Sequence, residues 1–167
     1  MVAYIRFKIL YKGWVKMTYI KTVETLCERA DRRGVAVNRK RRRYDDYGGM
    51  WGSSVIRDLI EVYRVESKDG IVKLYHYGTL TCVINRNTLS VDYVYGESIS
   101  DANSIYTFIN YYLNLEPRIG YRPVNGGLYI QTPETITRDG EIDTWLDVYY
   151  DENPEQFISS VNHAYSF

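Results

Sequence analysis

Two charged segments are the parts of this sequence best suited to chemistry with a partner. The first is a run of five consecutive basic residues at 39–43, which Tyr44, Tyr47 and Trp51 follow closely. Arg and Lys side chains neutralise phosphates and aromatic rings stack on bases, so this basic arm is expected to contact RNA or DNA. The alternatives are a solvated loop or an electrostatic contact with an acidic protein. The expected nucleic-acid-binding residues are Arg39, Lys40, Arg41, Arg42, Arg43 and Tyr44.

The second charged segment, residues 134–155, is acidic and contains Arg138 as its single basic residue. Its alternating carboxylates have two possible interpretations. In the first, they form the solvated face of a strand. In the second, they imitate the phosphate spacing of a nucleic acid and occupy a basic channel on another protein. Trp and Tyr side chains dominate the hot spots of protein interfaces, so the Trp and Tyr residues of this segment are candidates for binding a partner. The alternative is that these side chains are buried in the core. The expected protein-binding residues are Asp143, Trp145, Asp147, Tyr149, Tyr150 and Asp151.

Signals for catalysis are weak. The chain has two histidines, and His76 could form an acid/base pair across a sheet with Asp92 or Glu61, but a strand histidine is far more often a surface or core polar residue. No nucleotide-binding, metalloprotease or nucleophile-elbow motif occurs in the sequence. Cys27 and Cys82 are far apart and lack metal-ligand spacing. The expectation is therefore a protein that is not an enzyme, with no catalytic residues, no metal and no cofactor.

The overall charge is zero, but it is divided unevenly along the chain. Residues 1–44 hold 13 Lys or Arg against 3 acidic residues, and the remaining residues carry the opposite excess of ten charges. Such a division favours a charged partner, unless the two parts face each other and neutralise internally. With 167 residues, of which 45% are hydrophobic, the chain is expected to form one domain over 1–167.

Several predicted elements position the candidate binding residues. The first is a strand at 3–11, which the alternating pattern of this segment predicts. Residues 22–33 predict a helix with Thr22 as its cap and Gly34 just past its end. Its apolar stripe comprises Val23, Leu26, Cys27 and Ala30. Five like charges in a row repel one another, so a mobile basic loop is expected at about 38–50.

The middle of the chain predicts a β-meander. A helical turn near residue 53 gives way to a strand from about Ile60, and Asp-Gly at 69–70 is a hairpin signal. Strands are expected at 71–77, 80–84 and 89–95. A second helix follows, capped by Ser98 or Ser100 and ended before Pro117.

Beyond the second helix, the sequence predicts a loop containing Asn125-Gly126-Gly127, then strands at 128–132 and 142–148 and a terminal helix capped at Asn153. The fold class is α+β: a mostly antiparallel sheet with two or three packed helices.

The segment Leu74-Tyr75-His76-Tyr77-Gly78-Thr79, with the strand turn and Ser-capped helix that follow, resembles small uncharacterised accessory proteins of phages and archaeal viruses. The resemblance covers residues 71–113. It implies a protein that acts by binding a host machine, as do inhibitors of host immune nucleases, and it assigns no site residues.

Two functions are therefore expected as alternatives. One is a viral or mobile-element accessory protein that inhibits a host nucleic-acid-handling defence complex, such as a CRISPR effector, by steric or electrostatic blocking. The other is a nucleic-acid-binding regulator that uses the basic arm. A self-associating protein, in which basic and acidic faces of neighbouring copies meet, is a third possibility. The N-terminal segment is interrupted by Arg6, Lys8 and Lys12, so neither a targeting signal nor a membrane helix is expected and the location is expected to be cytoplasmic.

Overall fold

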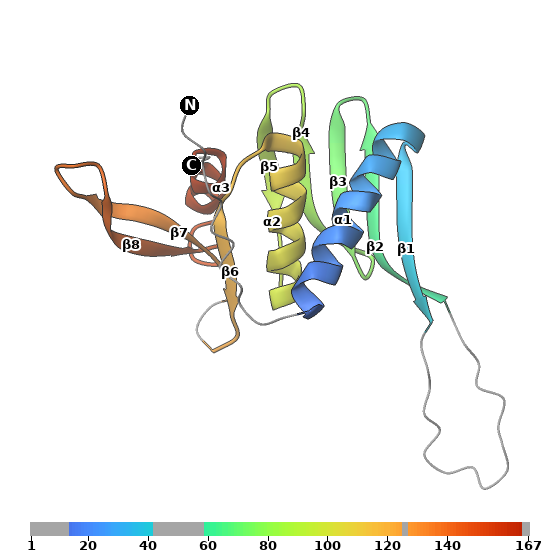
Figure 1. Cartoon of the computed structure of the whole chain (residues 1–167), viewed down its shortest axis with the longest axis horizontal. Coiled ribbons are helices and arrows are strands. Elements are labelled where there is room, and N and C mark those ends of the chain that lie inside the picture. The colour runs from blue at the N-terminus through green and yellow to red at the C-terminus, as the bar shows by residue number, and fades with distance from the viewer. Residues whose placement is uncertain (1–13, 42–58, 125–126, 165–167) are drawn as a thin grey trace, which may run out of the picture.

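Two antiparallel sheets and three helices form the part of the chain that the structure, a computed structural model, describes: residues 14–41, 59–124 and 127–164 (Figure 1). This arrangement confirms the α+β class. The elements in chain order are α1 (Trp14–Arg33), β1 (Val35–Arg41), β2 (Leu59–Lys68), β3 (Ile71–His76), β4 (Thr79–Asn85), β5 (Ser90–Val94), α2 (Ile99–Leu113), β6 (Arg118–Arg122), β7 (Gly127–Ile136), β8 (Ile142–Tyr149) and α3 (Pro154–Asn162).

The larger sheet is a meander in which β1 to β5 lie side by side in chain order. The Asp-Gly hairpin between β2 and β3 is confirmed, because Asp69 and Gly70 both have positive φ, at 51° and 80°. Two such residues in succession are what a two-residue turn needs to match the twist of its strands. The strand expected from about Ile60 is β2; the helical turn before it lies outside the described residues.

Helices α1 and α2 cover one face of this sheet (Figure 1). The predicted apolar stripe of α1 is buried, and Gly34 ends the helix with a φ of 81° and an N–H that donates to the carbonyl of Ala30 at 2.7 Å. The predicted start is wrong. The helix already runs from Trp14, because residues 14–21 contain no Gly or Pro to interrupt it, so Thr22 lies inside it rather than at its cap.

The basic run is only partly a loop. Residues 38–41, which the charge pattern assigned to a mobile loop, form the end of β1. Backbone pairing with β2 fixes them, and Glu61 lies opposite Arg39, so the positive charges do not prevent strand formation. The remainder of the expected loop, including Arg42, Arg43 and Tyr44, and the expected strand at 3–11 lie outside the described residues.

The smaller sheet has the order β6-β7-β8. Its inner face buries Leu128, Ile130 and Val148 in the same core as the helices, while the outer parts of β7 and β8 project from the body as a hairpin (Figure 1). Strand β6 corrects the expectation of a loop between α2 and residue 128. Its residues do alternate, with Ile119 and Tyr121 packed against the core, but the strand is only five residues long and pairing with β7 stabilises it.

The C-terminal helix α3 closes one edge of the larger sheet. Its predicted cap is confirmed, since the side chain of Asn153 accepts a hydrogen bond from the N–H of Gln156 at 3.0 Å. At its other end, the amide of Asn162 accepts from the N–H of Val91 at 2.7 Å and donates to the carbonyl of Val91 at 3.0 Å. The side chain thus pairs with edge strand β5 as a neighbouring strand would.

None of the helices within the described ranges combines the length and the apolar character needed to cross a membrane.

Candidate protein-binding surface

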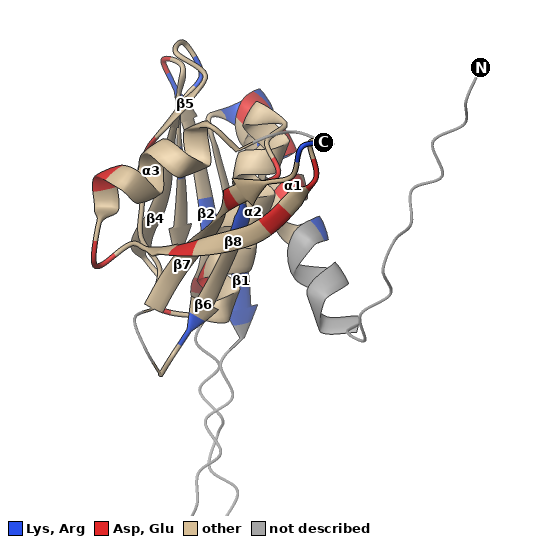
Figure 2. Ribbon diagram, turned by 90° about the vertical axis from the view of Figure 1, so that its left-hand side faces the viewer, with Lys and Arg blue, Asp and Glu red and all other residues tan. Residues whose placement is uncertain are grey.

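The acidic segment forms a hairpin that extends away from the rest of the molecule. We call residues 133–146, the outer parts of β7 and β8 with their turn, the acidic hairpin (Figures 1 and 2). Its exposed charged side chains are Glu134, Arg138, Asp139, Glu141 and Asp143. Two large apolar side chains accompany them, Ile136 at 63% and Leu146 at 44% exposure. Projection, negative charge and exposed apolar groups are thus combined in one element.

Side-chain and backbone bonds give the acidic hairpin a defined shape. The hydroxyls of Thr135 and Thr144 lie 2.7 Å apart across the two strands, and Thr144 also donates to Glu134 at 3.3 Å. At the turn, the N–H of Thr137 donates to the carbonyl of Glu141 at 2.7 Å, and the N–H of Glu141 donates back to the Thr137 hydroxyl at 3.1 Å. The carboxylates are therefore presented on an ordered scaffold.

At the base of the hairpin, two arginines of β6 lie over aromatic rings of the other two strands. The guanidinium of Arg118 is 3.8 Å from the ring centroid of Trp145, and that of Arg122 is 4.5 Å from the ring centroid of Tyr129. Tyr129 in turn contacts Tyr149 across the sheet, with ring centroids 5.8 Å apart. Such cation–π contacts hold the aromatic side chains in one orientation.

Arg122 also neutralises one of the expected acidic residues. Its Nη1 lies 2.5 Å from Oδ2 of Asp147 and donates to the hydroxyl of Tyr149 at 3.1 Å, while Gln131 donates to the other oxygen of Asp147 at 3.0 Å. The carboxylate of Asp147 is therefore paired with Arg122 and Gln131 inside the smaller sheet. It does not present a free charge of the kind that would imitate a phosphate.

Of the six expected protein-binding residues, three share the outer face of β8, because alternate residues of its regularly paired part point the same way: Trp145, Asp147 and Tyr149. Asp143 lies at an irregularity of the pairing between Ile142 and Thr144, where its carboxylate accepts from the Thr135 hydroxyl at 3.4 Å. The other two lie beyond the strand. Tyr150 packs edge-to-face on Phe157 of α3 with ring centroids 5.6 Å apart, and Asp151 is exposed in the turn before that helix. The arginines of β6 were not anticipated, although the alternation of Ile119 and Tyr121 with Arg118, Gly120 and Arg122 was a signal that could have indicated this short strand.

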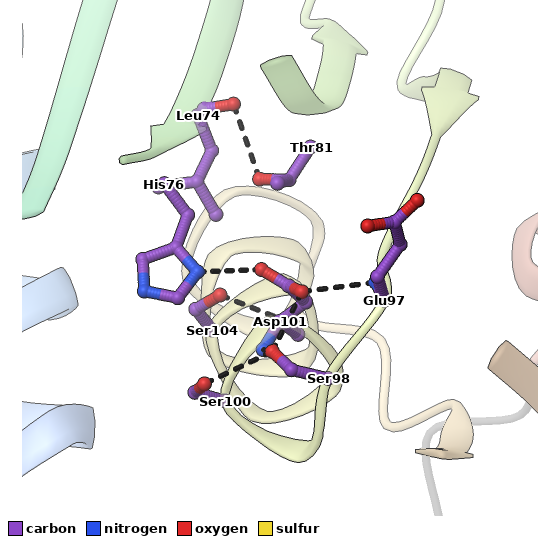
Figure 3. Close-up of polar contacts among 8 residues, drawn as sticks. All are labelled: Leu74, His76, Thr81, Glu97, Ser98, Ser100, Asp101 and Ser104. Carbon is purple, nitrogen blue, oxygen red and sulfur yellow. Dashed lines mark hydrogen bonds and ion pairs between the residues drawn. The ribbon is translucent and has the colours of Figure 1, made fainter. Parts of the chain in front are cut away.

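A second polar cluster lies between β3 and α2 (Figure 3). Nδ1 of His76 is 2.5 Å from Oδ1 of Asp101, and both residues are 8% exposed. The other oxygen of Asp101 accepts from the hydroxyl of Ser98 at 2.6 Å and from the N–H of Glu97 at 2.9 Å. The partner of His76 is therefore Asp101. The expected pairing with Asp92 or Glu61 is wrong, because α2 supplies the carboxylate to the buried face of the sheet.

This cluster has the properties of a structural clamp. Burial by itself would raise the pKa of Asp101, but hydrogen bonds from His76, Ser98 and the Glu97 N–H outweigh it and hold that pKa below its ordinary value. The hydroxyl of Ser98 donates to Asp101 and not to His76, so the trio lacks the hydroxyl–imidazole bond of a nucleophilic triad. The ring of Tyr63 stacks on His76 at 4.5 Å, which fixes the imidazole further.

The two cysteines are buried free thiols. Burial raises the pKa of Cys27 to about 12 and raises that of Cys82 as well, which disfavours the reactive thiolate. Within the ranges that the structure covers, no three or more His, Cys, Asp or Glu side chains gather in a way that would hold a metal ion.

The described part of the basic arm lies at the opposite end of the molecule. Arg39 and Lys40 are exposed on β1, and Figure 1 places β1 and the acidic hairpin at the two ends of the long axis. The described basic strand and the acidic hairpin therefore do not neutralise each other within the chain.

Comparison of the chain with protein-family models, curated proteins and solved structures gives no significant match.

Proposed function

We propose that this protein acts by binding. In this proposal the acidic hairpin enters a basic nucleic-acid-binding groove of a partner protein and blocks it. The observation that supports the proposal is the projection of an ordered, acidic β-hairpin beyond the body of the molecule (Figure 1). An isolated pair of strands is only marginally stable in water, so a hairpin kept ordered outside the core favours a role in contact with a partner.

The charges favour a basic partner over a nucleic acid at this site. Glu134, Asp139, Glu141 and Asp143 oppose Arg138 alone among the exposed hairpin residues, so the phosphate backbone would be repelled. A groove that normally holds phosphates has the complementary charge and would attract the hairpin from a distance. Ile136 and Leu146 add apolar area that a contact can remove from water.

The biological setting is proposed from the sequence resemblance. An accessory protein of a virus or mobile element, acting in the host cytoplasm, would use such a hairpin to inhibit a nucleic-acid-handling defence complex of the CRISPR effector kind. Steric blocking needs no catalytic group.

The test is displacement of nucleic acid from purified defence complexes. Each complex is loaded with a fluorescent oligonucleotide, the protein is added, and release is followed by anisotropy. Release by the wild type should be lost in a hairpin variant that is neutral at four positions: Glu134→Gln, Asp139→Asn, Glu141→Gln and Asp143→Asn.

The matched control removes the same number of charges from exposed positions elsewhere: Asp69→Asn, Asp92→Asn, Glu116→Gln and Glu152→Gln. Both variants have the same net charge, so a general electrostatic effect would weaken them equally. Equal weakening, or no release by the wild type from any complex, contradicts the proposal.

The alternative function, a nucleic-acid-binding regulator, is favoured by the exposure of Arg39 and Lys40 at the far end of the molecule. It predicts direct binding of single-stranded RNA or DNA with a steep dependence on salt. Arg39→Ala and Lys40→Ala should each reduce the slope by about one unit, because each variant neutralises one phosphate fewer.

A further inference from the structure

The two edges of the larger sheet are treated differently. At the β5 edge, Asn162 covers the backbone of Val91 with two hydrogen bonds. At the other edge, β1 pairs with β2 on one side, and among the described residues no strand lies on its other side. An open strand edge is a template for a further strand, and proteins usually protect it.

The register shows which backbone groups of β1 face outward. The carbonyl of Gly34 accepts from the N–H of Ser67 on β2 at 2.7 Å, so Gly34 and every second residue after it point their backbone groups towards β2. Val35 and Val37 then direct their N–H and C=O groups to the open side. The pairing is regular from Val35 to Asn38, where the first irregularity occurs. This edge therefore offers two regularly spaced residues for strand addition.

The strand itself is firmly held. Ala36 is buried under α1 and the full length of β1 pairs with β2, so an added strand would meet a preformed ladder. On the opposite face, Val35 is 49% exposed and Val37 is half-buried, which leaves apolar side chains beside the open edge. Backbone bonds supply affinity in strand addition, and such side chains supply specificity.

The charge of β1 determines which kind of strand it can bind. Arg39 and Lys40 are exposed on the same strand, so a second β1 laid alongside would be repelled. An acidic extended segment would be attracted by the same charges. A nucleic acid could bind the basic side chains of β1 but could not continue the hydrogen-bond ladder between peptide strands.

We propose that β1 binds an extended acidic segment of a partner protein as a sixth strand of the larger sheet. This site lies at the opposite end of the molecule from the acidic hairpin and does not depend on the function proposed for it (Figure 1).

The probe is a fluorescent ten-residue peptide of alternating valine and glutamate. Its control is the same peptide with every second backbone nitrogen methylated, which keeps the charge but removes the ladder donors. We expect saturable binding of the first peptide alone, at or below about 1 mM. Deuterium exchange at the amide of Val37 should slow when that peptide binds.

The decisive variant is Val37→Pro, which removes one outward N–H. Because that N–H faces away from β2, proline is compatible with the edge position and the fold should remain. Peptide binding should fall at least tenfold, whereas Val37→Thr, which keeps the N–H and replaces only one methyl group, should lose much less. Arg39→Glu with Lys40→Glu should also weaken binding and reverse the preference towards a lysine-containing peptide. Circular dichroism and urea unfolding check each fold.

Three results would overturn the proposal. The first is no difference between the two peptides, which would make the contact purely ionic. The second is no peptide binding together with RNA or DNA binding that Val37→Pro leaves unchanged. The third is self-association of the protein alone that Val37→Pro abolishes, which would make the occupant a second copy. The hairpin proposal is unaffected by any of these, since its variants lie at the other end of the molecule.

Discussion

His76 and Asp101 join the end of β3 to the first turn of α2, with Nδ1 of the histidine 2.5 Å from Oδ1 of the carboxylate. The two residues are 25 positions apart, and both are buried. Strand β6 packs on α2 and pairs with β7, so the placement of the helix also sets the placement of the sheet that bears the acidic hairpin. The buried pair therefore lies in the core that supports the smaller sheet, to which α3 also contributes through its packing on β7 and β8.

Asp101→Asn should weaken this clamp in a pH-dependent way. At neutral pH we expect the free energy of unfolding to fall by about 1–3 kcal/mol, because a charged hydrogen-bond acceptor is removed from a buried site. Since the pKa of Asp101 is lowered in the folded state, its carboxylate stabilises the fold fully above its unfolded pKa of about 4. That contribution is lost as the pH falls through the folded value.

Urea unfolding at several pH values measures this effect. The difference between wild type and Asp101→Asn should be largest above about pH 4 and should shrink at lower pH. Asp92→Asn, at an exposed position on β5, is the control and should change stability by less than about 0.5 kcal/mol. A constant difference across the acid range would show that the charge of Asp101 does not stabilise the fold.

Gly120→Ala tests the close approach between β6 and β7. A Cβ at Gly120 would lie 2.5 Å from both Cζ and Oη of Tyr129, so the ring must shift from its present position beside the guanidinium of Arg122. We expect a changed near-ultraviolet circular dichroism spectrum and a loss of about 1 kcal/mol of stability. In a Tyr129→Ala background the same change should cost less than about 0.5 kcal/mol. A similar cost in both backgrounds would contradict the close approach.

Asn162→Ala should expose the backbone of β5 at the edge of the larger sheet. Removal of the two bonds to Val91 is expected to lower the free energy of unfolding by about 1–3 kcal/mol and to speed deuterium exchange of the Val91 amide. Asn162→Asp keeps an acceptor for that N–H but sets a carboxylate oxygen against the Val91 carbonyl, so it should retain only part of the protection. Unchanged exchange in Asn162→Ala would show that the edge is closed by something else.

Local signals in the sequence predicted most of the fold. Hairpin turns such as Asp69-Gly70 and caps such as Ser98 and Asn153 are short-range features, and the structure confirms all three. The failures have long-range causes. Strand β1 forms despite its charges because β2 lies beside it, and β6 forms because β7 does. Neither partnership can be recognised from the residues of the strand itself.

The candidate site was predicted in the same uneven way. Alternation correctly placed Trp145 and Asp147 on one face of β8, but it could not predict the irregular pairing at Asp143. It could not show that Arg118 and Arg122 lie over that face, because this depends on the order of three strands. The acidic character of β8 is therefore weaker at its base than the sequence suggests, and the free negative charge is concentrated in the outer part of the hairpin.

Site-specific photo-cross-linking tests most directly whether the acidic hairpin binds a partner. A photoreactive aromatic amino acid replaces Ile136 in the acidic hairpin or, as a control, Ile99 on α2, which is the same residue type and is 62% exposed against 63%. Cells that produce the photoreactive variant are irradiated, and the cross-linked proteins are identified by mass spectrometry. We predict cross-links from position 136 to a nucleic-acid-handling protein, abolished when the four hairpin carboxylates are neutralised. Cross-links of equal yield from both positions, or none from position 136, would contradict the proposed role of the hairpin.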